Sequence, residues 1–339
     1  MKRWMAIAGA VAATAAVGYV AAWFYAANRF EEEIVDWLNE LEGEGVTVSH
    51  GEIHIEGFPL ALTARIPDLV LRNEVEGAKI EAAPIRLRTT IWSPHRIDYD
   101  FAGKHAIAAD DGARKANVTL SVETGKGVLL LSEGQRWNRV TMTNLRLIGE
   151  DQILSIAEME TSDRITPKPL GSTPETVQST VTVRGLAISN RLGVSVLDPA
   201  IDRLRIEMSA TGPFLEIFED GTLVDWANAG GVVTLRDLTL EWGGITLTAT
   251  GSGGFDSELR PEGALTLASA AFEEKLGELE RSGAIAPFVG TLVRRWTAPF
   301  ILPPRDGNPS ELIVPISAKD GLLSVGGKPL GAVPSLKTL

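Results

Sequence analysis

The chain has 339 residues, with 32 basic and 44 acidic side chains, a net charge of −12 at pH 7, and no cysteine. This charge balance excludes the broad basic surface of a nucleic-acid-binding protein. The absence of cysteine excludes disulfides, thiolate catalysis and Cys-ligated zinc. Hydrophobic residues make up 44% and charged residues 22%, so we expect a folded body with a large core and no nucleic-acid partner.

The N-terminus predicts a membrane span. Residues 5–27 form an uncharged, Ala-rich run, and a helix of that length crosses a hydrocarbon core of about 30 Å. Lys2 and Arg3 precede the run and three glutamates follow it, so residues 1–4 are expected in the cytoplasm and the body on the other side of the membrane. A cleaved signal peptide is the alternative, although its apolar region is usually about 7–15 residues long.

Residues 28–43 predict an amphipathic juxtamembrane helix. Its apolar residues recur at helical spacing and its acidic residues occupy the other face, while Gly43 and Gly45 are placed where a helix would end (the apolar positions are Phe30, Ile34, Leu38 and Leu41). Two interpretations remain open. The helix either packs on the module that follows, or it forms a stalk that plugs one end of that module.

From residue 46 onward the hydrophobic period changes to two, which is typical of β-strands. More than a dozen such runs, separated by Gly, Asp and Asn, predict a mainly β body built as a long antiparallel meander. We expect a first β half at residues 44–165 and a second at 176–339, with the Pro-rich segment 166–174 as a linker or long loop. Short helical insertions are expected near 214–229 and 270–296.

Gly57, Phe58 and Pro59 predict a corner of the sheet, because proline cannot donate to a β-ladder and glycine permits a bend. An entrance to an apolar groove is the alternative for these residues. Trp92, just before Ser93-Pro94, is expected at a strand end with a turn, where its indole packs over the core. The glycine-rich stretch 251–254 is interpreted as a hairpin turn or a bulge.

Motifs for catalysis are lacking: the sequence has neither a Gly-x-Ser-x-Gly elbow nor a phosphate-binding loop. His50, Glu52, His54 and Glu56 alternate along one expected strand, but successive positions on one face are about 7 Å apart, too far for a single zinc ion. An exposed strand face explains them better, and His105 is likewise expected at an exposed strand end. We therefore expect no enzyme activity, no catalytic residue, no metal site and no cofactor.

Several short motifs, taken in order, resemble a family of uncharacterised alphaproteobacterial envelope proteins that is similar to AsmA-like proteins of the Gram-negative inner membrane. The motifs are Gly57-Phe58-Pro59-Leu60, Ile91-Trp92-Ser93-Pro94, Gly230-Gly231 through Gly251, and Asp320-Gly321 through Pro334. This resemblance implies a curved sheet with an apolar inner face, anchored in the inner membrane by one pass and standing in the periplasm. Larger AsmA-like proteins are associated with moving lipids or with outer-membrane homeostasis, but this chain is too short to be assumed to bridge two membranes.

A sheet with one apolar face must cover that face with a helix, a second sheet or a ligand. Either the sheet closes as a sandwich or barrel, or it leaves a groove that accepts acyl chains. We accordingly expect a non-enzymatic, membrane-tethered periplasmic protein that binds lipid or another hydrophobic ligand and assists envelope biogenesis or lipid handling. The alternative is a structural scaffold with a closed β core and no ligand. Inner-membrane lipids and other envelope proteins are the expected partners.

Overall fold

The computed structural model describes residues 2–43, 46–73, 77–110, 115–132, 135–166, 176–192, 200–212, 223–304 and 309–335. The chain forms two compact units. Unit 1 contains Met1–Leu130 and Asn144–Glu150, and unit 2 contains Leu131–Thr143 and Asp151–Leu339. Of the expected linker 166–174, all but the first residue lies outside the described residues.

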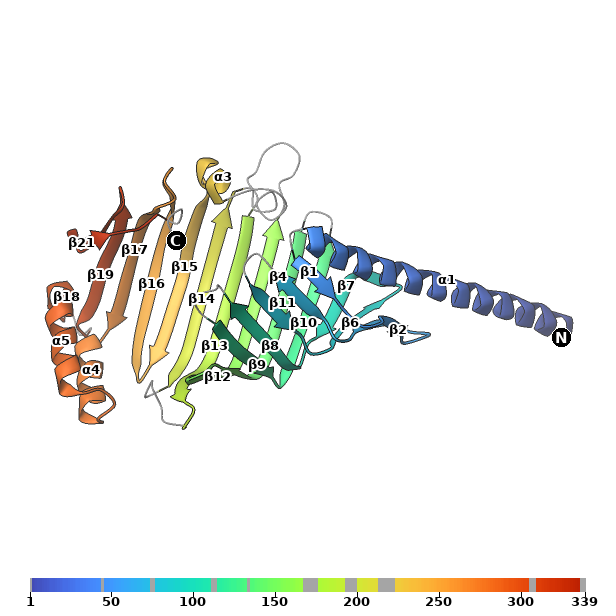
Figure 1. Ribbon diagram of the computed structural model, residues 1–339, viewed down its shortest axis with the longest axis horizontal. Coiled ribbons are helices and arrows are strands. Elements are labelled where there is room, and N and C mark those ends of the chain that lie inside the picture. The colour runs from blue at the N-terminus through green and yellow to red at the C-terminus, as the bar shows by residue number, and fades with distance from the viewer. Residues whose placement is uncertain are drawn as a thin grey trace. The chain divides into compact units, whose positions relative to one another are not determined.

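Unit 1 begins with one long helix, α1 (Lys2–Gly43), which runs without interruption through both the expected span and the expected juxtamembrane helix (Figure 1). Ala-rich sequence favours this continuity, and the helix ends at the first of the two expected glycine stops.

The predicted membrane span at residues 5–27 is wrong. Within the described residues, no helix combines the length and the apolar character needed to cross a bilayer. Part of the segment instead contacts protein, because Trp23 and Ala27 are buried against Leu62. The Trp23 indole Nε1 donates a hydrogen bond to the carbonyl oxygen of Ala61 at 3.1 Å, and the Tyr19 hydroxyl donates to that of Pro59. The single-pass inner-membrane localisation, with a cytoplasmic N-terminus and a periplasmic body, depended on this span and is corrected with it.

The strands of unit 1 form two antiparallel ladders, β1–β4–β5–β8–β9–β11 and β2–β3–β6–β7–β10. Their bounds are β1 (Val46–Ser49), β2 (His54–Glu56), β3 (Leu62–Ile66), β4 (Val70–Asn73), β5 (Ala78–Glu81), β6 (Ile85–Thr90), β7 (Ser93–Asp100), β8 (Gly103–Asp110), β9 (Lys115–Val122), β10 (Thr124–Ser132) and β11 (Gln135–Ile148), of which β10 and β11 extend into unit 2.

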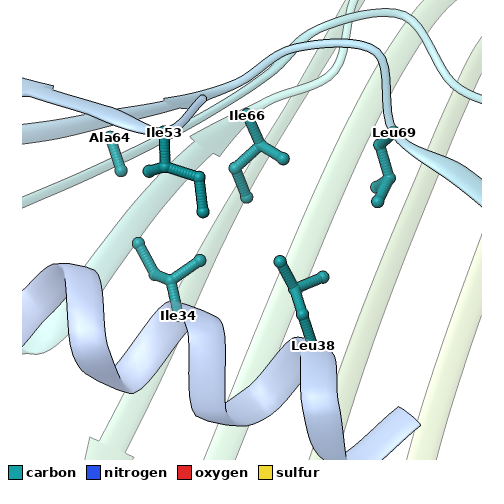
Figure 2. Packing of buried hydrophobic residues seen from close by; sticks show 6 residues of the cluster. All are labelled: Ile34, Leu38, Ile53, Ala64, Ile66 and Leu69. Carbon is teal, nitrogen blue, oxygen red and sulfur yellow. The ribbon is translucent and has the colours of Figure 1, made fainter. Parts of the chain in front are cut away.

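The core of unit 1 lies between the C-terminal half of α1 and these strands. Ile34 and Leu38 point from the helix toward buried side chains of the β region, namely Ile53, Ala64, Ile66 and Leu69 (Figure 2). The apolar stripe at helical spacing is thus the surface through which α1 packs on the β module.

Unit 2 is an antiparallel ladder in the order β12–β13–β14–β15–β16–β17–β19–β20–β21. The short strand β18 pairs with the start of β19, and β20 pairs with the end of β19 along the same edge. The strands are β12 (Gln152–Thr166), β13 (Thr176–Asn190), β14 (Ile201–Thr211), β15 (Val232–Trp242), β16 (Ile245–Phe255), β17 (Pro261–Ala270), β18 (Ile301–Leu302), β19 (Glu311–Lys319), β20 (Leu322–Val325) and β21 (Lys328–Ala332). The helices are α3 (Leu223–Asn228), α4 (Phe272–Arg281), α5 (Pro287–Thr297) and the 3₁₀ turn η1 (Ala298–Phe300).

The prediction of a mainly β, antiparallel fold with short helices is confirmed, since each of the 21 described strands pairs in antiparallel fashion. The barrel-like closure that was one alternative is not formed by the described strands, and the ladder of unit 2 stays open. Helix α4 lies within the expected insertion 270–296, and α5 begins within it and ends one residue beyond, at Thr297. Only the last part of the expected helical region 214–229 is described, as α3.

Candidate functional site: an apolar groove on unit 2

Residues that pair across the strands of unit 2 form continuous apolar rows on one face. Because directly opposite residues in a β-ladder project to the same side, the pairing register defines each row. One row contains Leu235, Gly251, Leu265, Ile316 and Val325, and the next contains Val233, Gly253, Gly263, Ala318 and Leu323. The apolar face therefore runs without a break from β15 to β20.

One end of this face is covered by the α4–α5 pair. Phe272, Leu276 and Leu279 of α4 are buried against Ile245 of β16 and Leu312 of β19. Leu267 and Val314, which lie two residues along their strands from Leu265 and Ile316 and on the same face, also pack against this cluster. The helices thus cover the face up to the rows described above.

The opposite end is closed by Trp226 of α3, whose side chain is only 2% exposed. Its indole Nε1 donates a hydrogen bond to the carbonyl oxygen of Thr211 at 3.0 Å. The ring lies edge-on to Phe255, with the ring centres 6.1 Å apart, and fills the space over Gly231. In Figure 1, α3 lies near the start of β15, whereas α4 and α5 lie at the other end of these strands.

Between these two covers the face is hollowed into a groove with a cavity volume of about 350 Å³. The residues of the two apolar rows other than Val325 line it together with Phe255 and Pro261. A Cβ atom on Gly251 or Gly263 would lie closer than 3.0 Å to a backbone oxygen of the neighbouring strand. Only glycine fits where backbones approach so closely, and the missing side chains leave the hollow.

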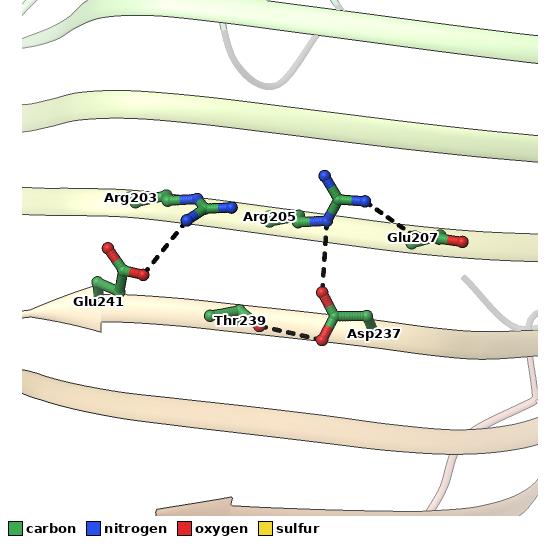
Figure 3. Close-up of polar contacts among 6 residues, drawn as sticks. All are labelled: Arg203, Arg205, Glu207, Asp237, Thr239 and Glu241. Atoms are coloured by element: carbon green, nitrogen blue, oxygen red, sulfur yellow. Dashed lines mark hydrogen bonds and ion pairs between the residues drawn. The ribbon is translucent and has the colours of Figure 1, made fainter.

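The other face of the unit 2 sheet carries charged side chains where β14 and β15 pair. Arg205 pairs with Glu207 at 3.0 Å and with Asp237 at 3.5 Å, Arg203 pairs with Glu241 at 3.5 Å, and the Thr239 hydroxyl donates to Asp237 (Figure 3). Such partly exposed pairs each contribute only about 0–1 kcal/mol to stability. Where β14 and β15 pair, this face is therefore charged and partly exposed to water, in contrast to the apolar face that carries the groove.

The predicted site residues Gly57, Phe58, Pro59 and Trp92 belong to unit 1, and the groove of unit 2 uses none of them. Gly57 has φ 106°, and its carbonyl oxygen accepts hydrogen bonds from the backbone N–H groups of Leu60 and Ala61. The Phe58–Pro59 peptide bond is cis. This tight turn has the geometry of a corner.

Phe58 and Trp92, the two aromatic residues among the predicted site residues, are largely exposed. Phe58 is half exposed and lies edge-on to Trp23, with ring centres 5.3 Å apart, and parallel to Phe24 at 6.4 Å. Trp92 is 64% exposed in the turn between β6 and β7. Its indole therefore does not pack over a core, contrary to the expectation from the sequence.

The histidines show one further error of sequence reasoning. Glu52 and His54 are exposed and 4.0 Å apart, and strand β2 begins only at His54. In the part of the chain that the structure describes, no group of three or more His, Cys, Asp or Glu side chains is placed to hold a metal ion. His105, however, is buried: its Nδ1 accepts from the Ala83 N–H at 3.2 Å and its Nε2 donates to the Phe101 carbonyl at 2.9 Å.

Sequence reasoning gave an apolar groove as one alternative but did not identify the residues that line it. The stretch 251–254 was expected as a hairpin turn or a bulge, but it belongs to β16 and pairs residue by residue with β17. The sequence does contain a pattern that predicts this strand. Gly251 and Gly253 continue the alternation of Leu247 and Ala249 with polar residues, so all four are expected on one face of a strand.

The fold and the groove together define an antiparallel β protein with an open, partly covered apolar face and a long N-terminal helix. The chain belongs to the family DUF2125, described as an uncharacterized protein conserved in bacteria, whose family model matches residues 23–334. Comparison with curated proteins and with solved structures returned no match. The expectation of a family of unknown function is confirmed by this match.

Proposed function

We propose that this protein is a non-enzymatic binder of lipid acyl chains, or of similarly elongated apolar molecules, and that the groove of unit 2 is the binding site. The observation that carries the proposal is the uncovered stretch of apolar rows between Trp226 and the α4–α5 pair. Its volume of about 350 Å³ falls within the range of small-molecule sites, which are concave and mostly apolar.

The energetics favour long or paired chains over short ones. Burying about ten methylene groups gains about 8 kcal/mol. Association costs at least about 4 kcal/mol, so the remainder corresponds to a dissociation constant of about 1 mM. Tight binding therefore requires a longer chain, a second chain or contacts with a polar head group.

A role in lipid handling or envelope biogenesis is part of the same proposal. It is supported by the resemblance of several short motifs to AsmA-like proteins, whose larger members are associated with moving lipids. The lipids of the bacterial inner membrane are the ligands that this resemblance favours.

The test compares the full-length protein with two variants of one strand. Leu265→Gln places an amide in the groove, whereas Thr266→Gln makes the same kind of change on the hydrated face of β17 and is the matched control. Native mass spectrometry of the purified chain is expected to show bound lipid, and a fluorescent long-chain fatty acid is expected to bind about tenfold more weakly to Leu265→Gln than to the control. Leu323→Gln, on the short strand β20, repeats the test at a second position of the groove.

A chain that purifies without lipid and also fails to take up the fluorescent fatty acid would contradict the proposal. That result would favour the alternative function, a scaffold that binds other envelope proteins without a ligand. Equal weakening by Leu265→Gln and Thr266→Gln would likewise show that the ligand binds elsewhere.

A further inference from the structure

Helix α5 carries an apolar stripe that faces away from the protein. Phe288, Leu292 and Trp296 are 73%, 49% and 64% exposed and follow one another at intervals of four residues, so they share one face of the helix. Three large apolar side chains in a row on one face of a helix are unusual on a surface that contacts only water.

The opposite face of α5 is the one that holds the helix in place. Arg294 forms two hydrogen bonds with the carboxylate of Glu280 on α4, at 2.9 and 2.6 Å. Gly290 is buried against the same glutamate, and Val293 packs on the core beneath the helices. The orientation of α5 is therefore determined without the stripe, which is left free for an external contact.

The charged residues near the stripe indicate what kind of partner would bind it. Residues 281–304 contain no acidic residue, although the whole chain has a net charge of −12. Of their three arginines, Arg294 is paired with Glu280 of α4, so Arg281 at the end of α4 and Arg295 on α5 are the cations that remain for a partner. Arg295 is exposed and directly precedes Trp296. A helix with Phe, Leu and Trp on one face and arginine beside them suits the boundary between the head groups and acyl chains of an anionic bilayer.

We propose that α5 docks unit 2 on the surface of an anionic phospholipid bilayer, with Phe288, Leu292 and Trp296 entering the head-group boundary. This proposal goes beyond ligand binding, since it stands on the exposed face of α5 and holds whether or not the groove contains a lipid. The two are adjacent, because the helices that present the stripe also cover one end of the groove.

The test uses the absence of native cysteine, which lets one engineered thiol report one position of the full chain. Phe288→Cys and Leu192→Cys are each labelled with an environment-sensitive nitrobenzoxadiazole dye. Leu192 is the matched control, because it is an apolar residue of the same unit that is 89% exposed. Vesicles of phosphatidylcholine alone and of phosphatidylcholine with one quarter phosphatidylglycerol are then added.

We expect the dye at residue 288 to shift its emission to the blue, more strongly with the anionic vesicles, and to be quenched by a lipid-embedded quencher. The dye at residue 192 is expected to stay unchanged. In the Phe288→Cys background, Arg295→Gln is expected to weaken binding to anionic vesicles about fivefold. Because the three stripe residues and Arg295 are exposed, thermal melting of these variants should stay close to that of the parent chain.

Three outcomes would overturn the docking proposal. The first is no shift at residue 288, and the second is an equal shift at residues 288 and 192. The third is a shift without vesicles that grows with protein concentration, which would show that a second copy of the chain covers the stripe. Leu265→Gln should leave the shift at residue 288 intact, so failure of groove binding and failure of docking are distinguishable.

Discussion

Asp256 organises the turn between β16 and β17 through three accepted hydrogen bonds. Its Oδ1 accepts from the backbone N–H groups of Glu258 and Arg260, both at 2.9 Å, and its Oδ2 accepts from the Arg260 Nε at 2.7 Å. These bonds favour the ionised carboxylate, chiefly through the backbone N–H of Arg260, and hold the pKa of Asp256 below its ordinary value. This turn connects two strands that line the groove.

A pH dependence follows from that lowered pKa. A carboxyl group whose pKa is lower in the folded than in the unfolded chain stabilises the fold above the unfolded pKa, about 3.9 for aspartate. The contribution is lost as the pH falls through the folded pKa. We therefore expect Asp256→Asn to unfold at a lower urea concentration than the parent at pH 7, and the two midpoints to converge as the pH is lowered toward 2.

The control for this experiment is Glu258→Gln, because the ion pair between Glu258 and Arg260, at 3.1 Å, involves a largely exposed carboxylate and contributes little to stability. Its midpoint should differ little from that of the parent chain across the same pH range. A constant gap between Asp256→Asn and the parent at every pH would contradict the role assigned to the charge.

At the scale of elements, strands β16 and β17 approach each other closely enough to leave no room for a side chain at Gly251 and Gly263. A Cβ on Gly263 would meet the backbone of Ser252 and Gly253, whereas a Cβ on Gly331 in β21 would meet nothing within 4 Å. The two glycines therefore form a matched pair with opposite expected responses to the same substitution.

Gly263→Ala is expected to lower the free energy of unfolding by about 1–3 kcal/mol, because the added methyl group forces the strands apart. Gly331→Ala is expected to be neutral, or to stabilise by up to about 1 kcal/mol, since alanine reduces the entropy of the unfolded chain. Urea denaturation followed by far-UV circular dichroism measures both. Similar effects of the two substitutions would show that the close approach of β16 and β17 is not what requires glycine.

The elements themselves were largely predictable from local pattern. Alternation at residues 245–250 and 264–268 predicts the strands that became β16 and β17, and the break near Gly283 and Pro287 predicts the separation of α4 from α5. The stretch 251–254 was not predictable in the same way, because glycine in isolation favours a turn. Its place in a strand depends on pairing with β17, which local sequence does not specify.

For the whole molecule, a bound ligand should appear as added stability. A ligand that binds only the folded chain raises the free energy of unfolding by about 2.7 kcal/mol when its free concentration is one hundred times Kd. We expect a long-chain fatty acid at that excess to raise the melting temperature of the parent chain and of Thr266→Gln.

The same concentration should raise the melting temperature of Leu265→Gln only about half as much, because tenfold weaker binding leaves the ligand at ten times the variant's Kd, which adds about 1.4 kcal/mol. Differential scanning calorimetry with and without fatty acid makes the comparison. An equal increase for Leu265→Gln would place the ligand outside the groove, and no increase for the parent chain would argue against a hydrophobic ligand of this class.

Composition and periodicity by themselves determined that this is a mainly β, antiparallel protein with few helices, because side-chain alternation is a local property of each strand. Only the tertiary structure decided how the apolar residues are used. An apolar helical run looks the same in sequence whether it faces lipid or protein, and burial of Trp23 against Leu62 is a contact between distant segments. The groove likewise exists only in the register that brings Gly251, Gly263 and Ile316 onto one face, since pairing between strands is non-local.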